Sequence, residues 1–156
     1  MHPSVERVTA RLHELGARGD VRVLDGSART AAQAAEHLGV LPAQIANSLV
    51  FSADGAPTLV MASGGHRVDT AKVAALLGAQ SVERADADFV RTHTGFAIGG
   101  VAPVGHPQPL RTLVDQDLAS YDEVWAAAGH PHAVFPTTFA ELLELTGGSP
   151  ADVAAV

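Results

Sequence analysis

Apolar residues recur every three or four positions in five segments, which is the spacing of a helix that buries one face. Each segment begins at a side chain that can accept a hydrogen bond from the first helical turn, and each ends at a glycine. Two of the caps, Thr30 with Gln33 and Thr138 with Glu141, form capping-box patterns. A further short helical piece is expected to follow Pro42 and to end near Ala46. Five main helices are therefore predicted, over residues 4–16, 30–39, 69–78 and 138–147, with the fourth in chain order beginning at Asp86 or Asp88 and ending at Gly95.

Short runs of β-branched and apolar residues between these helices predict strands. The pair Asp54-Gly55 lies between two such runs and indicates a hairpin. The strands outnumber what simple βαβ alternation would give, so we expect an α/β fold of the α+β kind, with a mixed sheet and helices outside it. The expected strands cover residues 21–24, 48–52, 58–62, 111–114, 123–128 and 133–135, and a further brief strand begins at Val82.

The stretch from Thr94 to Pro109 fits neither pattern. Gly99 and Gly100 disfavour a helix, and Pro103 lacks an amide donor, yet the apolar residues of this stretch indicate that the backbone runs inside the domain. Its glycine spacing is neither that of a P-loop nor that of a dinucleotide-binding turn. Two interpretations stay open: a loop whose small residues let a ligand approach closely, or a buried bulge in which glycine only satisfies a positive φ.

Length and composition limit the possible architectures. The chain has 156 residues, of which 47% are hydrophobic, and no cysteine. We therefore expect one domain over residues 1–156, with an N-terminal helix within 1–20 and a frayed tail over 149–156. The sequence begins without an apolar signal core and has no run long enough to cross a bilayer, which favours a cytoplasmic protein without a membrane partner.

The formal net charge of −7 opposes strong binding to nucleic acid through bulk electrostatics. Lys72 is the only lysine and is expected to be a solvated surface residue. A polynucleotide partner would have to be held by a local patch. Its possible members are Arg67, Arg84, Arg91 and Arg111.

Eight histidines raise the question of a metal site. His130 and His132 would lie on one face of an extended strand, but no third ligand stands at a convincing spacing. We therefore predict neither a metal nor a cofactor. His66 and His106 flank the glycine-rich segments, where they could donate to a substrate or make structural hydrogen bonds.

Asp115 follows an apolar strand, and two roles stay open for it. It could bind an ammonium group or a ribose hydroxyl, or it could cap a nearby turn. Ser48 and Ser63 have no accompanying histidine and aspartate in the sequence that would indicate a catalytic triad. Trp125 and Phe135 are most simply interpreted as core residues.

Several spaced blocks of this chain, from about Val21 to Gly148, together resemble the YbaK/EbsC family. These proteins are free-standing relatives of the editing domain that is inserted in bacterial prolyl-tRNA synthetases. The most diagnostic block is the Gly-x-x-x-Pro element from Gly99 to Pro103. The others are residues 45–51, 62–64, 67–69, 114–115 and 127–129, followed by Pro136 and the last capped helix.

The resemblance implies a mixed, largely antiparallel sheet that is curled like a barrel and flanked by helices. It also implies hydrolysis of the ester that joins a small noncognate amino acid, often alanine, cysteine, serine or threonine, to tRNA. The partners would be aminoacyl-tRNA, bound through its acceptor end, and an aminoacyl-tRNA synthetase. The implied catalytic positions are Gly99, Gly100 and Asn47; the implied substrate-binding positions are Ser48, Ser63, His66, Pro103, His106, Asp115 and Gly129.

One position departs from the family pattern. The family normally carries a lysine before the Ser/Thr-Leu-Val-Phe block, whereas this chain has Asn47 there. Asparagine offers donors and an acceptor but no charge. Two functional hypotheses follow: a deacylase with altered substrate preference, or a module that binds the aminoacyl end of tRNA and has lost turnover.

Overall fold

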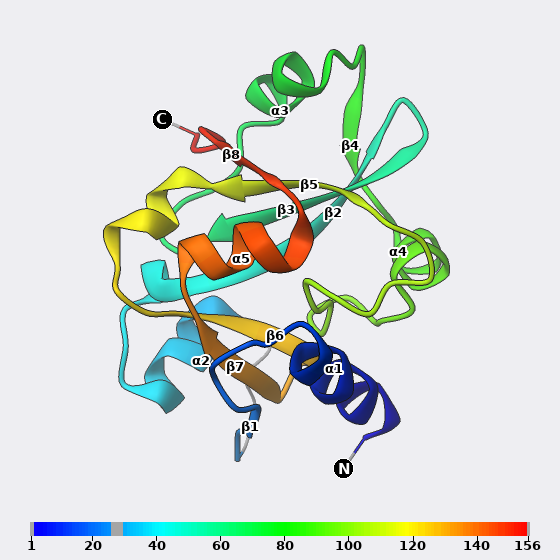
Figure 1. Ribbon diagram of the computed structural model, residues 1–156. Coiled ribbons are helices and arrows are strands. Elements are labelled where there is room, and N and C mark those ends of the chain that lie inside the picture. The colour runs from blue at the N-terminus through cyan, green and yellow to red at the C-terminus, as the bar shows by residue number, and fades with distance from the viewer. Residues whose placement is uncertain (1, 26–29, 156) are drawn as a thin grey trace.

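The computed structural model describes residues 2–25 and 30–155. In this part of the chain, one eight-stranded mixed sheet is accompanied by five α-helices and two 3-10 helices (Figure 1). The helices are α1 (Pro3–Glu14), α2 (Ala31–Leu38), η1 (Pro42–Gln44), α3 (Thr70–Leu77), α4 (Ala87–Thr94), η2 (Gln116–Ser120) and α5 (Phe139–Thr146). The strands are β1 (Arg22–Val23), β2 (Ile45–Ala53), β3 (Ala56–Ser63), β4 (Val82–Arg84), β5 (Arg111–Asp115), β6 (Val124–His130), β7 (Ala133–Thr137) and β8 (Ser149–Ala151).

The helix ends follow the capping chemistry of the sequence. At α2, the Thr30 hydroxyl accepts the Gln33 amide at 3.1 Å, and the Gln33 side chain accepts the Thr30 amide, so the predicted capping box is confirmed. Gly39 then ends the helix in the left-handed conformation with φ of 70°. The cap of α1 differs from the prediction, because the His2 ring, rather than Ser4, caps the helix by accepting the Ser4 amide.

The predicted hairpin between β2 and β3 is confirmed. Asp54 and Gly55 have φ of 51° and 88°, which is the double positive φ that a tight hairpin turn requires. The strand is longer than the sequence indicated, since β2 begins at Ile45, where a short helical piece was expected. The expected helical piece is the 3-10 turn η1, which ends at Gln44, just before β2 begins.

The strands run in the order β1-β7-β6-β2-β3-β5-β8, with β4 paired to β2 beside this path. Four pairs are antiparallel and three are parallel, so the predicted mixed sheet is confirmed. The barrel-like curl stays a prediction, because the described strand order has two ends that do not pair with each other.

The core is divided among three clusters of buried side chains. The main cluster lies beneath α1, α4 and α5 and contains Phe96 and Phe135, which are almost fully buried. A second cluster joins α2 to the start of β2 and to Trp125, and a third joins α3 to β3 and β8. Burial of one such large side chain stabilises the fold by roughly 1.5–3 kcal/mol.

The expectation of a frayed tail over 149–156 is wrong for most of its residues. β8 pairs in parallel with β5, and Val153 is completely buried. The only lysine, Lys72, donates to the Ala154 carbonyl at 2.8 Å and lies 3.2 Å from Asp152. The tail is therefore anchored by strand pairing and by a lysine that had been expected to be free in solvent.

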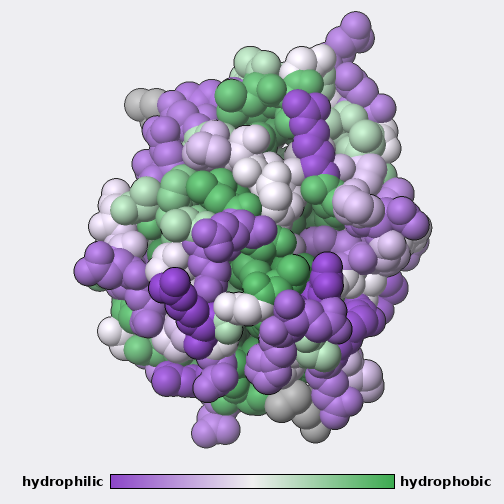
Figure 2. Space-filling model, viewed as in Figure 1, coloured by the Kyte–Doolittle hydropathy of each residue, from purple (hydrophilic) through white to green (hydrophobic). Residues whose placement is uncertain are grey.

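The outer surface is mixed in character. On the face drawn in Figure 2, apolar side chains gather in several separate patches divided by polar ones. None of the described helices is both long enough and apolar enough to cross a membrane.

Candidate functional site

A gap in the sheet lies along one edge of β2. β6 pairs with β2 only at Ile45 and Ala46, and β4 pairs with it only from Phe51 to Ala53. Between these two contacts, residues 47–50 have a strand partner on the β3 side alone. A sheet edge without a partner strand presents peptide donors and acceptors to whatever lies beside it.

The direction of the peptide groups follows from two hydrogen bonds. The Ile45 carbonyl accepts Gly64 N–H on the β3 side, and the Val50 carbonyl accepts Ala85 N–H on the opposite side. Because peptide groups alternate in direction along a strand, the N–H and C=O of Ser48 point to the same side as those of Val50. The main chain of Ser48 therefore faces the gap, while its hydroxyl donates to the sulfur of Met61 at 3.2 Å.

A cavity of about 360 Å³ occupies this gap, and we call it the β2 cavity. Its floor is β2, and its walls come from α2, β6, the end of β4 and the Gly-x-x-x-Pro loop. Its wall combines apolar side chains with polar groups, as is usual for sites that bind small molecules. The residues that line it include Thr30, Ala34, Ile45, Asn47, Ser48, Arg84, Ile98, Gly99, Trp125, Pro131 and Val134.

The two glycines of the loop differ in the state of their amides. The Gly100 amide donates to the Ala97 carbonyl at 3.0 Å, so it is already occupied in a turn. The Gly99 amide has no hydrogen-bond partner among the described residues, and Gly99 is exposed at the cavity with φ of 90°. The prediction that both glycine amides serve an incoming acyl group therefore fails for Gly100 in this conformation, whereas the amide of Gly99 has no partner among the described residues.

The loop is held from behind by close packing. A Cβ atom on Gly100 would lie 2.8 Å from the Cα of His130, and one on Gly129 would lie 2.7 Å from the Ser4 carbonyl oxygen. Gly129 is buried and has φ of 99° at a register shift between β6 and β7. Gly129, predicted to bind substrate, instead lets β6 approach α1, and it is not among the residues of the β2 cavity.

His106 also lies behind the loop. Its Nε2 is 2.7 Å from the Ala102 carbonyl oxygen, and its ring meets Phe96 edge-on at 6.1 Å. Burial lowers the pKa of His106 below its ordinary value, with Arg7 adding to the effect and the hydrogen bond to Ala102 opposing it. A neutral ring with its proton on Nε2 donates to that carbonyl. His106 and Pro103 line a separate hollow of about 240 Å³, so they support the loop rather than the cavity.

Asn47 and Arg84 supply polar side chains to the β2 cavity. Asn47 is half-buried on β2, and its side-chain carboxamide has no hydrogen-bond partner among the described residues. Arg84 is exposed at the end of β4, with its guanidinium carbon 5.8 Å from the centre of the Phe51 ring. The cavity therefore offers a neutral donor and acceptor on its floor and a cation at its edge.

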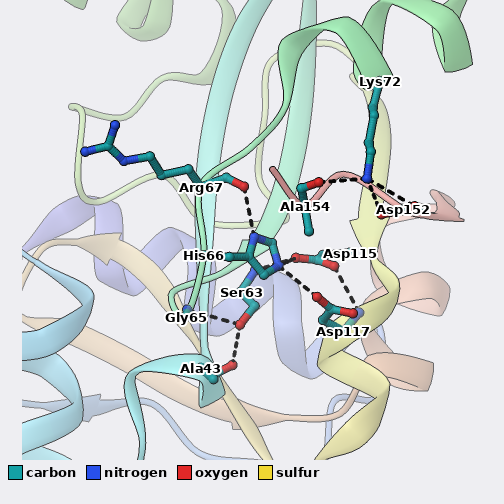
Figure 3. Close-up of polar contacts among 10 residues, drawn as sticks. All are labelled: Ala43, Ser63, Gly65, His66, Arg67, Lys72, Asp115, Asp117, Asp152 and Ala154. Atoms are coloured by element: carbon teal, nitrogen blue, oxygen red, sulfur yellow. Dashed lines mark hydrogen bonds and ion pairs between the residues drawn. The ribbon is translucent and has the colours of Figure 1, made fainter. Parts of the chain in front are cut away.

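Three other predicted residues are brought together at a different place. Figure 3 shows Ser63, His66 and Asp115 in one cluster with Asp117, and none of the four lines the β2 cavity. The Asp115 carboxylate is fully buried and accepts the amides of Ser63 and Asp117, each at 2.9 Å. Of the two roles left open for Asp115, the structure therefore shows the capping of a turn.

His66 completes this cluster. Its Nε2 lies 2.7 Å from Asp115 and 3.1 Å from Asp117, while its Nδ1 lies 3.0 Å from the Arg67 carbonyl oxygen. The two contacts of Nε2 are short enough for ion pairs, yet Nε2 does not have hydrogen-bond alignment with either oxygen. We interpret them as electrostatic contacts and name the cluster Ser63, His66, Asp115 and Asp117 the β5 clasp, because it ties the end of β5 to the loop after β3.

The β5 clasp is also where a metal ion would find ligands. Possible ligand atoms of His66, Asp115 and Asp117 lie within 4.8 Å of one another in the described structure. Both Asp115 oxygens already accept backbone amides, which is what a structural carboxylate does without an ion. The histidine pair considered from the sequence is arranged differently, because His130 Nδ1 accepts the His132 amide at 3.2 Å.

A larger hollow of about 420 Å³ lies beside α5, away from the Gly-x-x-x-Pro loop. Its charged residues are one cation, Arg18, and four carboxylates, Asp122, Glu123, Glu141 and Glu144. This excess of negative charge disfavours any ligand that carries phosphate. The β2 cavity is therefore the better candidate for an anionic substrate.

Of the predicted site residues, Asn47, Ser48 and Gly99 meet at the β2 cavity, and the sequence interpretation missed one important wall. Trp125 was assigned to the core, and it is 94% buried, but it also lines the cavity. Its neighbour Ile45 on β2 is paired with it across the parallel contact. No signal along the chain distinguishes such a residue from an ordinary core aromatic, because the distinction depends on where β6 leaves β2.

A family profile described as "Aminoacyl-tRNA editing domain" matches residues 25–145. The uncharacterized protein YwhH of Bacillus subtilis (strain 168) is 29% identical over 144 residues, which cover 92% of this chain and 91% of YwhH. The proline–tRNA ligase of Bacillus licheniformis is 36% identical over 89 residues, which are 57% of this chain but only 16% of the ligase.

Solved structures agree with the sequence relatives. The crystal structure of a "putative trans-editing enzyme for prolyl tRNA synthetase" has a TM-score of 0.94 and 43% identity, and the match covers 100% of this chain and 99% of that one. The structure of the hypothetical protein APE2540 has a TM-score of 0.88 and 30% identity, with coverage of 96% and 99%. The fold of this chain is thus shared with both solved structures over nearly their whole length.

Proposed function

The chain belongs to the aminoacyl-tRNA editing domain family, and we propose that it is a free-standing deacylase that hydrolyses the ester of a small noncognate amino acid on tRNA. The observation that carries this proposal is the unpartnered Gly99 amide, which lies at the cavity that Asn47 also lines. Similarity to the trans-editing structure supports the choice of substrate.

In the proposed reaction, a water oxygen attacks the carbonyl carbon of the aminoacyl ester. The carbonyl oxygen becomes negatively charged and accepts a hydrogen bond from Gly99 N–H. A donor already in place at such an oxyanion stabilises the transition state by roughly 3 kcal/mol. The bond between the carbonyl carbon and the ribose oxygen then breaks, and the ribose oxygen takes up a proton that derives from the water.

No protein nucleophile is required in this scheme. The chain has no cysteine, and the Ser48 hydroxyl faces Met61 rather than a histidine. The adjacent ribose hydroxyl of the terminal adenosine is close to the ester by covalent geometry, and we propose that it relays the proton. Asn47 would orient the ester or the α-amino group through its carboxamide, which both donates and accepts.

Arg84 is the proposed contact for a phosphate of the tRNA end. It is an exposed cation at the edge of the cavity, and the chain carries seven more negative than positive charges. With so few cations, tRNA binding should be weak and should weaken further as salt is added. Delivery of the substrate by a synthetase is compatible with such weak binding and belongs to the proposal.

Asn47 favours one alternative function. Since the family pattern has a lysine there, this chain could bind the aminoacyl end of tRNA without turning it over. The two functions are separated by a panel of mischarged tRNAs offered to the wild type and to Asn47→Lys. The deacylase predicts release of amino acid by the wild type above the rate without protein, whereas the binding module predicts release only by the variant.

A further inference from the structure

The main chain of Ser48 has no hydrogen-bond partner among the described residues. β6 stays paired with β2 only as far as Ala46, and beyond the gap the Val50 carbonyl already accepts the Ala85 amide. Ser48 lies between these two points, with its N–H and C=O both facing the gap. Peptide groups in a folded domain are nearly always paired, so an unpaired donor and acceptor on one half-buried residue call for a partner.

The β2 cavity lies at this edge of the strand. Asn47 and Ser48 are neighbours in β2, so their side chains leave opposite faces of the sheet, yet both residues line the cavity. The two ends of the gap, Ala126 of β6 and Ala85 after β4, line it as well. A space that touches both faces of a strand lies beside its edge. Because the Ser48 hydroxyl is turned to Met61 of β3, it is the main chain of Ser48 that borders the cavity.

An aminoacyl ester carries the complementary pair of groups. In an extended conformation its α-ammonium and its carbonyl oxygen point to the same side, as the N–H and C=O of a strand residue do. Placed opposite Ser48, it makes the two hydrogen bonds of an antiparallel residue pair. A longer peptide finds less, because Ala46 is already paired with β6 and the Val50 carbonyl is already occupied. The gap therefore fits one residue rather than a strand.

Both groups of the ester need what Ser48 offers. No carboxylate of a described residue lines the cavity, so the acceptors for an ammonium group are carbonyl oxygens of the main chain and of the Asn47 side chain. The oxyanion is also short of donors. The Gly100 amide is occupied by the Ala97 carbonyl, which leaves Gly99 as a single donor from the loop, although an oxyanion can accept two hydrogen bonds.

We propose that the main chain of Ser48 pairs with the aminoacyl group as one residue of an antiparallel strand, binding the α-ammonium through its C=O and giving the oxyanion a second donor through its N–H. The inference rests on the proposed function and restricts the substrate to acyl groups with a free α-amino group. Loss of the charge-assisted hydrogen bond of the ammonium should cost about 10- to 100-fold in kcat/KM.

The first test changes the acyl group on tRNA. Alanyl, lactyl and propionyl esters carry an α-ammonium, an α-hydroxyl and no α-donor, on nearly the same carbon skeleton. Each kcat/KM is divided by the rate without protein, because the ammonium group activates the ester by itself. The wild type should accelerate the alanyl ester about 10- to 100-fold more than the propionyl ester, with the lactyl ester between them.

Ser48→Pro tests the donor, because proline lacks the N–H and is tolerated where that N–H faces away from a partner strand. It should lower kcat about 100-fold for all three esters. Val23→Pro is the matched control. The Leu24 amide donates to the His132 carbonyl, so the adjacent Val23 N–H points out of the sheet, and Val23 does not line the cavity. Val23→Pro should keep kcat within about two-fold.

The acceptor is tested by a single atom of the backbone. Nonsense suppression with leucic acid, the α-hydroxy analogue of leucine, at position 49 turns the Ser48 carbonyl into an ester carbonyl, which is a weaker acceptor. The alanyl preference over propionyl should fall by about five-fold or more. Leucic acid at position 59 is the control, because Leu49 and Leu59 each lose an N–H from a strand ladder and Leu59 does not line the cavity. This control should keep the preference.

Binding is measured without turnover by titration calorimetry with alanyl and propionyl sulfamoyl adenosines. If the wild type hydrolyses none of the esters yet binds the alanyl compound about ten-fold more tightly, the deacylase proposal fails and the pairing with Ser48 stands. Three results overturn the pairing: equal treatment of the alanyl and propionyl groups, an undiminished preference with leucic acid at position 49, or a folded Ser48→Pro variant with wild-type kcat. The first two results decide the matter even where Ser48→Pro does not fold.

Discussion

The backbones of Gly100 and His130 lie so close that a Cβ atom on Gly100 would be 2.8 Å from the Cα of His130. These residues are thirty positions apart, and their contact sets the distance between the Gly-x-x-x-Pro loop and the end of β6. Gly99, the preceding residue of the loop, lines the β2 cavity, and its amide has no partner among the described residues. The position of the proposed oxyanion donor therefore depends on a packing contact made by its neighbour.

Gly100→Ala should separate the loop from β6. The added methyl group must displace backbone rather than a flexible side chain, which costs about 1–3 kcal/mol of unfolding free energy and shifts the Gly99 amide. Deacylation should fall by at least ten-fold, as measured in single turnover. Gly148→Ala is the matched control, because its Cβ would lie 2.8 Å from the Thr112 carbonyl oxygen, far from the loop in sequence and outside the cavity. Equal losses of activity in both variants would argue against a positional role for Gly100.

Gly99→Ala tests the donor itself. Gly99 has φ of 90°, a conformation that costs alanine about 1–2 kcal/mol, and relief of this strain would turn the amide away from the cavity. We expect kcat to fall about 100-fold, because a misplaced catalytic group loses most of its effect. Gly55→Ala carries the same backbone penalty at φ of 88° in the β2–β3 hairpin and should keep full activity. A fully active Gly99→Ala enzyme would remove Gly99 from the mechanism.

Asp115→Asn distinguishes a structural from a substrate-binding role. The buried carboxylate accepts two amides and lies beside His66, so the substitution leaves at least one buried partner unsatisfied. The unfolding free energy should drop by about 2–4 kcal/mol in urea, while kcat/KM below the unfolding transition should stay within about two-fold. Asp152→Asn, which removes an exposed partner of Lys72, should cost less than about 1 kcal/mol. Loss of substrate affinity without loss of stability would restore the predicted role in substrate binding.

His106 should make stability depend on pH. Burial lowers its pKa below the ordinary value of 6.5, so the unfolded chain binds a proton more readily than the folded one. The stabilising contribution is fully present above pH 6.5 and is lost as the pH falls through the lower pKa of the folded state. His106→Gln keeps a donor for the Ala102 carbonyl but does not titrate. Its unfolding free energy should therefore decline less than that of the wild type between pH 7 and pH 5, and identical declines would contradict the assignment.

Asn47→Lys, used above to separate the two candidate functions, also probes the electrostatics of the cavity. A lysine there adds a cation to the floor, close to where the proposed oxyanion forms. If the wild type is an active deacylase whose site is suited to a neutral side chain at position 47, the variant should not hydrolyse the ester faster than the wild type. Salt titration of both proteins measures whether the added cation also contacts a phosphate, because each such contact steepens the dependence of binding on salt.

The local features of the fold were predictable because they are determined within a few residues. The capping box of Thr30 and Gln33, the left-handed glycine that ends each of several helices, and the Asp54-Gly55 turn all depend on hydrogen bonds between residues at most four apart. Such interactions are determined by residues that are close together in the sequence. The motif of residues 99–103 likewise indicated the family, and it led to Gly99 as a candidate site residue.

The site itself was decided by contacts between distant segments. Parallel pairing of β6 with β2, and of β8 with β5, has no turn signal in the sequence, because the partners are joined by long crossovers. The short β6 contact opens the gap in which Ser48 presents its main chain and Trp125 becomes a wall of the cavity. The hydrogen bond from the Ser63 amide to the Asp115 carboxylate likewise joins residues 52 positions apart, so the sequence alone did not indicate it.

The sequence alone thus determined the family, the helices with their caps, and the presence of an unusual glycine-rich loop. Tertiary structure decided which of the two glycine amides lacks a partner among the described residues, which polar residues line the cavity, and that the tail pairs with β5. The physical reason is that propensity and capping act along the chain, whereas a cavity is bounded by side chains and peptide groups that meet only when the sheet is assembled.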